Sequence, residues 1–166
     1  MNEEGDIIVS KNLKFCEHCK KNVESTITKE DINYTIHGKP VMLKSDVIRC
    51  KDCGEELNDN ELFEVNSKLA REKYIKQYNI VSPNEILSLL HLYNISPSVL
   101  SIIIFNNNMT IKKLCSGKLP TPEESEKLKE ITTNPAVVIE MLKEKKTQIS
   151  DTECTMCEHI IQKLIK

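Results

Sequence analysis

Two cysteine motifs decide the fold expected for the first part of the chain, Cys16-Glu17-His18-Cys19 and Cys50-Lys51-Asp52-Cys53. They are separated by 30 residues, and a two-residue spacer lets both sulfurs of one turn reach a single ion at about 2.3 Å. Four thiolates saturate a tetrahedral Zn²⁺ and leave no position open for water, so such a site is structural rather than catalytic. The sequence therefore predicts one Zn²⁺ held by Cys16, Cys19, Cys50 and Cys53. His18, between the first two cysteines, is an alternative ligand.

The segment between the two motifs has the pattern of β-strands. Apolar side chains alternate in Ile32–Ile36, and again after the turn signal His37-Gly38-Lys39-Pro40, where His37 is expected to face solvent. A short apolar run, Val47-Ile48, leads into the second motif. We expect a small antiparallel sheet with a hairpin, in a zinc-binding domain over residues 1–57 whose first 14 residues form a tail or an edge segment. The bound metal compensates for the small core of so short a domain.

The remainder of the chain is predicted to be helical. A linker helix is expected over residues 58–79, capped by Asn58 or Asp59. Its apolar residues Leu62, Val65, Leu69 and Ile75 recur near helical spacing as a stripe, with charged residues between them. A helix-turn-helix domain follows over residues 80–132, and C-terminal helices occupy residues 133–166. The predicted fold class is therefore α+β, with a small four-cysteine zinc-binding β-hairpin domain followed by an all-α helix-turn-helix domain.

Residues 84–117 have the spacing of a helix-turn-helix. Its three short helices are Asn84–Tyr93, Pro97–Ile104 and Met109–Ser116, joined by turns of three to four residues. The third helix would read DNA, since Asn bonds adenine and Lys contacts guanine or phosphate. The candidate nucleic-acid-binding residues are Asn107, Asn108, Thr110, Lys112 and Lys113. A small helical interaction bundle is the alternative, because residues 79–131 hold five Lys and five Glu.

The chain resembles MqsA-type (YgiT zinc-finger) antitoxins, and more closely the related bacterial and phage proteins that join this finger to an XRE-type helix-turn-helix, some with a SocA-like tail. The resemblance covers about residues 15–150. It rests on the cysteine pairs and on five further stretches. These are Ile48-Arg49-Cys50-Lys51-Asp52-Cys53-Gly54-Glu55-Glu56, Leu69-Ala70-Arg71-Glu72-Lys73-Tyr74, Val81-Ser82-Pro83-Asn84-Glu85-Ile86, Leu100 through Gly117, and Asn134-Pro135 with the helix that follows. It implies a two-domain dimer that represses its own operon, with a zinc-bearing domain that often engages a toxin and a helix-turn-helix that binds an operator.

Six residues in three places differ from that family and keep a second function open. Pro97 replaces a polar, Gln-like residue, Phe105-Asn106 replaces Gly-Phe, and Lys113-Leu114-Cys115 replaces Arg-Tyr-Glu in the reading helix. The chain could thus be a phage or mobile-element inhibitor with a degenerate helix-turn-helix. Such an inhibitor would bind a bacterial protein, for example a toxin or a CRISPR-type defence nuclease.

A third cysteine group lies near the C-terminus, in Cys154-Thr155-Met156-Cys157-Glu158-His159. A second zinc here would need Cys115 or a symmetry mate, and the favoured interpretation is that these cysteines are small packing residues on the apolar face of a helix. That face also suggests a homodimer, although it can pack back onto the chain's own helix-turn-helix instead. The candidate dimer or partner contacts are Cys157, Ile160, Ile161 and Leu164.

Composition narrows the remaining function classes. The 166 residues carry a net charge of −2 at 29% charged residues, so any contact with nucleic acid must be local. No apolar run approaches the roughly 18–20 residues that span a membrane, and the acidic start Met1–Asp6 is not expected to be a signal peptide. We therefore expect a cytoplasmic protein. Six of its seven cysteines lie in Cys-x-x-Cys pairs, which in that compartment indicate metal or redox chemistry rather than a disulfide framework. No glycine-rich phosphate loop or nucleophile elbow occurs, and we predict that the protein is not an enzyme.

Overall fold

The computed structural model describes the backbone of residues 8–164 and the side chains of residues 13–163. The chain divides into two compact units, Met1–Tyr74 and Ile75–Lys166. We call them the sheet unit and the helical unit and describe each by itself. The first contains an antiparallel sheet and the second contains only helices, so the predicted α+β fold class is confirmed.

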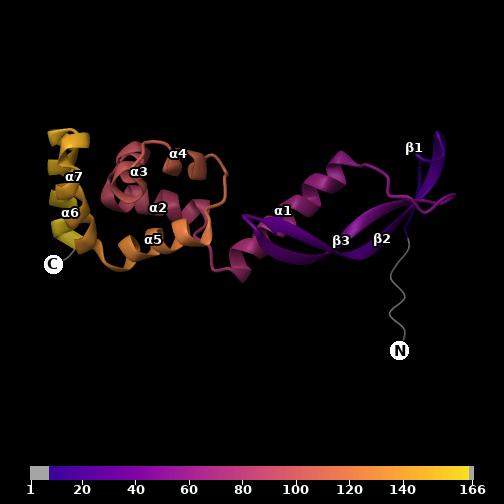
Figure 1. Cartoon of the computed structure of the whole chain (residues 1–166), viewed down its shortest axis with the longest axis horizontal. Helices are drawn as coiled ribbons and strands as arrows, with labels where there is room; N and C mark the ends of the chain where they lie inside the picture. The colour runs from indigo at the N-terminus through magenta and orange to yellow at the C-terminus, as the bar shows by residue number, and fades with distance from the viewer. Residues whose placement is uncertain (1–7, 165–166) are drawn as a thin grey trace, which may run out of the picture. The chain divides into compact units, whose positions relative to one another are not determined.

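The sheet unit is built on three antiparallel strands in the order β1-β2-β3 (Figure 1). The strands are β1 (Ile8–Cys16), β2 (Lys21–Ile36) and β3 (Lys39–Cys50). The β2–β3 hairpin turns at His37 and Gly38, whose φ angles of 49° and 73° are those of a type I′ turn, and His37 is exposed as expected. The strand β1 shows that part of the first 14 residues forms an edge segment.

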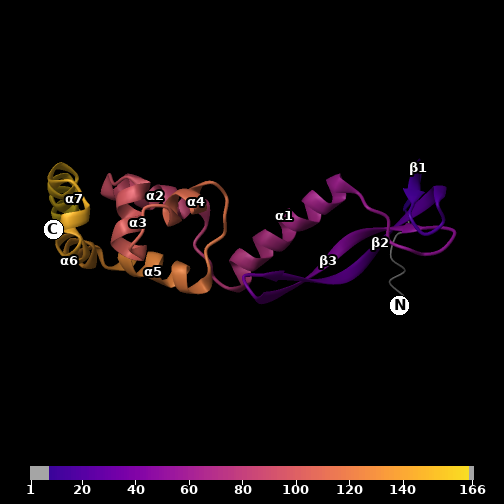
Figure 2. The ribbon, with the colours of Figure 1, turned by 45° about the horizontal axis from the view of Figure 1, so that its top comes forward.

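Helix α1 (Asn60–Gln77) begins in the sheet unit and lies along the β2–β3 hairpin (Figures 1 and 2). Its start is capped by Asp59, one of the two predicted caps, whose carboxylate accepts the Leu62 amide at 2.8 Å and Lys14 Nζ at 2.6 Å. The predicted apolar stripe is covered only in part, since Leu62 and Ile75 are half-buried and Leu62 packs against the core of the sheet unit. The helix buries Asn66, Ala70 and Tyr74, whereas Val65 and Leu69 are 54% and 42% exposed.

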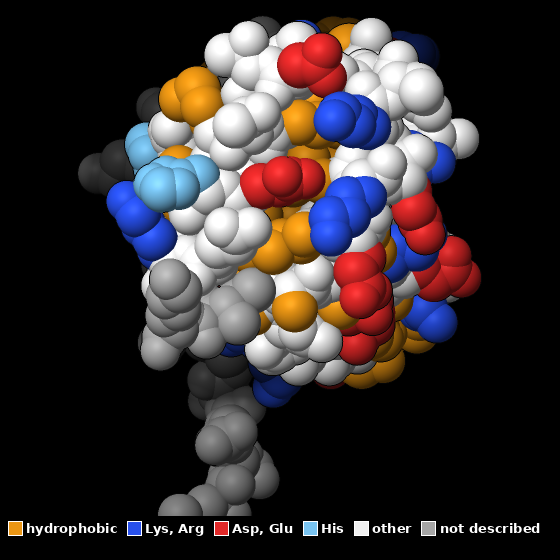
Figure 3. Space-filling model, turned by 90° about the vertical axis from the view of Figure 1, so that its left-hand side faces the viewer, with side chains coloured by type: hydrophobic (Ala, Val, Ile, Leu, Met, Phe, Trp, Pro, Cys, Tyr) orange, Lys and Arg blue, Asp and Glu red, His pale blue; other side chains and the backbone are white. Residues whose placement is uncertain are grey.

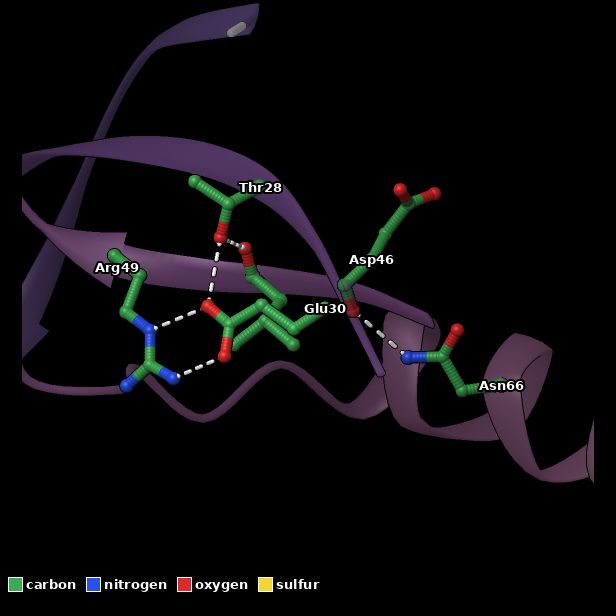
Figure 4. Close-up of polar contacts among 6 residues, drawn as sticks. Thr28, Glu30, Asp46, Arg49 and Asn66 are labelled. Atoms are coloured by element: carbon green, nitrogen blue, oxygen red, sulfur yellow. Dashed lines mark hydrogen bonds and ion pairs between the residues drawn. The ribbon is translucent and has the colours of Figure 1, made fainter. Parts of the chain in front are cut away.

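Polar contacts fix the sheet and attach α1 to it (Figure 4). Arg49 on β3 donates two hydrogen bonds to Glu30 on β2, at 2.8 and 2.6 Å, and Thr28 donates a third at 2.9 Å. The Arg49 guanidinium and the Thr28 hydroxyl lower the pKa of Glu30 to about 2. Asn66 of α1 donates its side-chain amide to the Asp46 carbonyl of β3 at 2.8 Å.

The helical unit consists of short helices with strong start signals. They are α2 (Pro83–Tyr93), α3 (Pro97–Phe105), α4 (Thr110–Cys115), α5 (Pro122–Thr133), α6 (Pro135–Glu144), the 3₁₀ turn η1 (Lys146–Gln148) and α7 (Asp151–Leu164). Ser82, Ser96 and Thr121 each accept a backbone amide of the following turn, and a proline stands at the first helical position after each. The starts of α2, α3 and α4 agree to within one residue with the starts predicted for the helix-turn-helix.

One hydrophobic core joins these helices. It contains Ile86 and Tyr93 from α2, Leu100 from α3, and side chains from every later helix through Ile161 of α7. The helices after residue 132 therefore belong to the same unit as the helix-turn-helix. In the described part of the chain, no single helix is long and apolar enough to cross a membrane, and α2 and α3, which would pass only as a pair, bend by 100° at their junction.

Candidate metal centre and nucleic-acid interface

The strand register brings the two cysteine motifs to one end of the sheet. Cys16 ends β1 and Cys50 ends β3, and their cross-strand partners on β2 are Lys21 and Ser25. The second cysteine of each pair lies in the turn that leaves its strand. Because β2 lies between β1 and β3, both turns meet beside its first residues.

The four sulfur atoms form one cluster, as the sequence predicted. The Sγ atoms of Cys16, Cys19, Cys50 and Cys53 all lie within 4.8 Å of one another. The Sγ–Sγ distances are 3.6 Å between Cys16 and Cys53 and 3.9 Å between Cys19 and Cys50. All four are free thiols, and together they can hold a metal ion.

The two turns have the same backbone geometry. The amide four residues after the first cysteine donates to its carbonyl at 2.8 Å in both, from Lys20 to Cys16 and from Gly54 to Cys50. Lys20 and Gly54 both adopt a left-handed conformation, with φ of 54° and 76°. Glycine is suited to that conformation and marks the second turn in the sequence, whereas a lysine does not mark the first.

The four thiols differ in their burial and in the hydrogen bonds that their sulfurs make. Cys16 and Cys50 are buried, Cys19 is half-buried and Cys53 is exposed. Burial opposes ionisation of Cys50, but backbone amides of Cys53 and Asp52 donate to its sulfur and lower its pKa to about 7. A hydrogen bond with Cys53, followed by burial, raises the pKa of Cys19 to about 12. The Cys50 thiol therefore ionises more readily than that of Cys19. His18 is exposed and lies outside the cluster.

The C-terminal cysteines serve as packing residues, as the favoured interpretation predicted. Cys154 and Cys157 are 4% and 2% exposed within the core of the helical unit, and burial raises the pKa of both thiols. His159 is exposed. Among the residues with described side chains, the cluster of Cys16, Cys19, Cys50 and Cys53 is the only group of three or more His, Cys, Asp or Glu residues that could hold a metal ion.

The predicted dimer contacts need correction. Cys157 and Ile161 are buried in the chain's own core, so they cannot form a contact between copies, while Ile160 is half-buried. The side chain of Leu164 lies outside the described residues. At the end of the helical unit that carries α6 and α7, hydrophobic side chains appear in several small areas between charged and polar ones (Figure 3). The final helix therefore uses its apolar face within the chain.

The predicted DNA-reading residues lie in the short helix α4 or in the turn just before it. Asn107, Asn108, Lys112 and Lys113 are exposed and Thr110 is half-buried. The Asn107 side-chain oxygen accepts the amides of Met109 and Thr110 at 3.0 and 2.9 Å, so it fixes the start of α4. The buried Ser101 hydroxyl of α3 accepts the Ile111 amide at 2.8 Å and locks the two helices together.

Two lysines that sequence reasoning missed lie close to the C-terminal end of α3. Lys145 Nζ donates to the Asn106 side chain at 3.1 Å, and Lys127 Nζ lies 5.9 Å from the centre of the Phe105 ring. The sequence carries a signal for the basic surface at this turn, although not for these two lysines. Residues 86–122 contain Lys112, Lys113 and Lys118 but no Asp or Glu, which a charge count over 79–131 conceals.

Neither a model of a known protein family nor a curated protein sequence matches the chain. The likeness to MqsA-type antitoxins therefore rests on the motifs quoted in the sequence analysis.

Proposed function

We propose that the four-cysteine cluster is a structural zinc site. A tetrahedral ion with four bonds of about 2.3 Å separates its sulfurs by about 3.8 Å. The Cys16–Cys53 and Cys19–Cys50 distances of 3.6 and 3.9 Å lie on either side of that value. Since four thiolates fill the coordination sphere, the ion would stabilise the fold and perform no chemistry on a substrate.

Metal analysis tests this proposal. Freshly purified protein kept reduced should contain one equivalent of zinc per chain, and Cys50→Ser should lose it. Cys115→Ser is the matched control, because this half-buried cysteine lies in the helical unit. A wild-type chain without metal, or a Cys50→Ser chain that keeps its full equivalent, would contradict the assignment.

The helical unit, in this proposal, is a helix-turn-helix that binds operator DNA and represses transcription. The observation that best supports this proposal is the exposed basic surface at the α3–α4 turn. Lys112 and Lys113 project from α4, Lys145 approaches the turn, and the acid-free stretch 86–122 leaves no carboxylate of its own to oppose a phosphate. The 100° bend between α2 and α3 and the short turns are those of helix-turn-helix domains. An overall charge of −2 does not prevent such local binding.

A mobility-shift assay with DNA upstream of the protein's own gene tests operator binding. Affinity should fall steeply with salt, and Lys112→Ala and Lys113→Ala should each reduce the logarithmic salt slope by about 0.9. Lys163→Ala is the control, since this exposed lysine lies on α7. The absence of a shift on every upstream fragment at low salt would refute DNA binding.

The second candidate function is binding of a protein partner. An antitoxin would bind its partner in addition to an operator, whereas an inhibitor of a toxin or of a defence nuclease would bind its partner in place of DNA. Two observations favour it. Helix α4 has only six residues and Asn107 is used in its start. The sheet unit also exposes Leu13, Phe15 and Phe63 by 63%, 53% and 69%. Purification from host cells should then yield a stoichiometric protein after nuclease treatment, and Phe63→Asp should reduce its recovery. Recovery of DNA with no such protein counts against this candidate.

A further inference from the structure

Ser25 on β2 carries a buried hydroxyl without a hydrogen-bond partner. Its side chain is fully buried, and in the described part of the chain its Oγ is the buried side-chain polar atom that no partner satisfies. The comparable buried hydroxyl of Ser45 on β3 is paired with Tyr34 Oη at 3.0 Å. Because an unsatisfied buried hydroxyl is destabilising, the position of Ser25 calls for an acceptor among the groups that face it.

The strand register places two residues opposite Ser25, Ser10 on β1 and Cys50 on β3, and of these only Cys50 has a described side chain. Ser25 is directly opposite Cys50 in the β2–β3 ladder. The next pair, Glu24 and Lys51, is hydrogen-bonded through the Lys51 amide at 3.1 Å, and the Cys50 amide donates to Glu55 at 2.8 Å instead of to β2. The pair of Ser25 and Cys50 is therefore of the non-hydrogen-bonded type, in which opposed side chains share a face and approach most closely.

Metal binding changes what the Cys50 sulfur can accept. A neutral thiol is a weak acceptor, whereas a metal-bound thiolate accepts several hydrogen bonds. Backbone amides of Cys53 and Asp52 already donate to this sulfur. Residues of this kind orient a ligand and adjust its donor strength, and their loss commonly lowers metal affinity 10–100-fold.

We propose that the Ser25 hydroxyl donates to the Cys50 sulfur when the cluster holds its metal, so that Ser25 is a positioning residue of the site. This inference rests on the proposed metal site. The competing explanation is that Ser25 only fills space between the strands. The two explanations predict different effects of Ser25→Ala on metal affinity. If Ser25 is filler, Ser25→Ala removes an unsatisfied hydroxyl and leaves metal affinity unchanged or higher. If Ser25 is a donor to the thiolate, the same substitution weakens metal binding.

Cobalt and zinc titrations of the full-length reduced chain distinguish them. The wild type should bind one equivalent of Co²⁺ with the absorption of a tetrahedral thiolate complex, and failure at this step refutes the metal site itself. Ser25→Ala should bind Zn²⁺ about tenfold more weakly in competition with a chelator, and should shift the sulfur-to-cobalt charge-transfer band. Ser25→Thr, which keeps the hydroxyl, should restore the wild-type band.

Ser45→Ala is the matched control, since it removes a buried hydroxyl from the same sheet at a position opposite Glu30. Its cobalt band should equal that of the wild type. A Ser25→Ala chain with wild-type zinc affinity and an unshifted band overturns the inference, as does a Ser25→Thr chain that behaves like Ser25→Ala.

Discussion

Truncation of Ile161 to alanine should destabilise the helical unit strongly. Its side chain is completely buried and shares the core with Leu142 of α6 and with Cys157 one turn earlier on α7. The substitution removes three carbon atoms, whose transfer from water accounts for about 2.4 kcal/mol at about 0.8 kcal/mol each. The cavity left behind adds to this, and core Ile→Ala changes cost about 2–5 kcal/mol, so we expect a loss of about 3 kcal/mol.

That loss is large enough to measure by thermal unfolding. For a unit of about 90 residues, 1 kcal/mol corresponds to about 4–8 °C in Tm, so the midpoint should fall by about 12–24 °C. Circular dichroism at the helix minimum follows the transition, because most helical residues belong to α2–α7. Ile160→Ala on the same helix is the control, and its half-buried side chain should give a much smaller change.

Light scattering on the same samples tests whether Ile161 of α7 packs inside the chain and not between two copies. Ile161 lies in the chain's own core, so Ile161→Ala at a temperature where it stays folded should have the mass of the wild type, whether that is one chain or two. A variant with an unchanged Tm and half the wild-type mass would refute this reasoning and return Ile161 to an interface between copies.

Three further predictions concern other parts of the chain. Removal of the metal by a chelator should unfold the sheet unit and leave the helical unit folded, because their cores are separate; amide hydrogen exchange resolves the two, and joint loss of protection would contradict it. Ser101→Ala should cost about 1–3 kcal/mol in urea unfolding, since it leaves the buried Ile111 amide without its acceptor, and an unchanged midpoint would contradict this. The Ser82 amide and hydroxyl lower the pKa of Glu85. The folding stability gained in this way is present above the pKa of glutamate in the unfolded chain, about 4.3, and is lost as the pH falls below that value. The free energy of unfolding of the helical unit should therefore decline below that pH, and Glu85→Gln should flatten its pH dependence in this range.

The metal cluster could be predicted from the sequence because its geometry is mostly local. Each Cys-x-x-Cys pair sets its own turn, and only the strand register is needed to bring the turns together. The position of Ser25 could not be predicted, because it depends on which residue of β2 faces Cys50 and on how the next pair is hydrogen-bonded. No feature of an isolated serine in an alternating stretch carries that information.

Helix α1 shows why an apolar stripe can mislead. The stripe of Leu62, Val65, Leu69 and Ile75 suggests that the most hydrophobic residues are covered. Of these four, Leu62 does pack against the sheet core. The rest of the contact is made by positions 66, 70 and 74, where Ala70 permits close approach and Asn66 satisfies the Asp46 carbonyl. A two-stranded surface covers only a narrow strip of a helix, so Val65 and Leu69 remain exposed. The helix and its cap could be predicted from the sequence, but the contact face was decided by the shape of the sheet.

Charge in the helical unit was underestimated for a related reason. A balanced count over residues 79–131 combines the acidic α5 and the first turn of α2 with a stretch, 86–122, that carries only basic charge. Folding separates these groups further, since Lys145 from beyond that window reaches the α3–α4 turn. DNA responds to the local field within about a Debye length and not to the net charge of a segment. The charges that matter for operator binding are therefore those brought together at this turn, and substitution of Lys145 should weaken binding with the same salt dependence as substitution of Lys112.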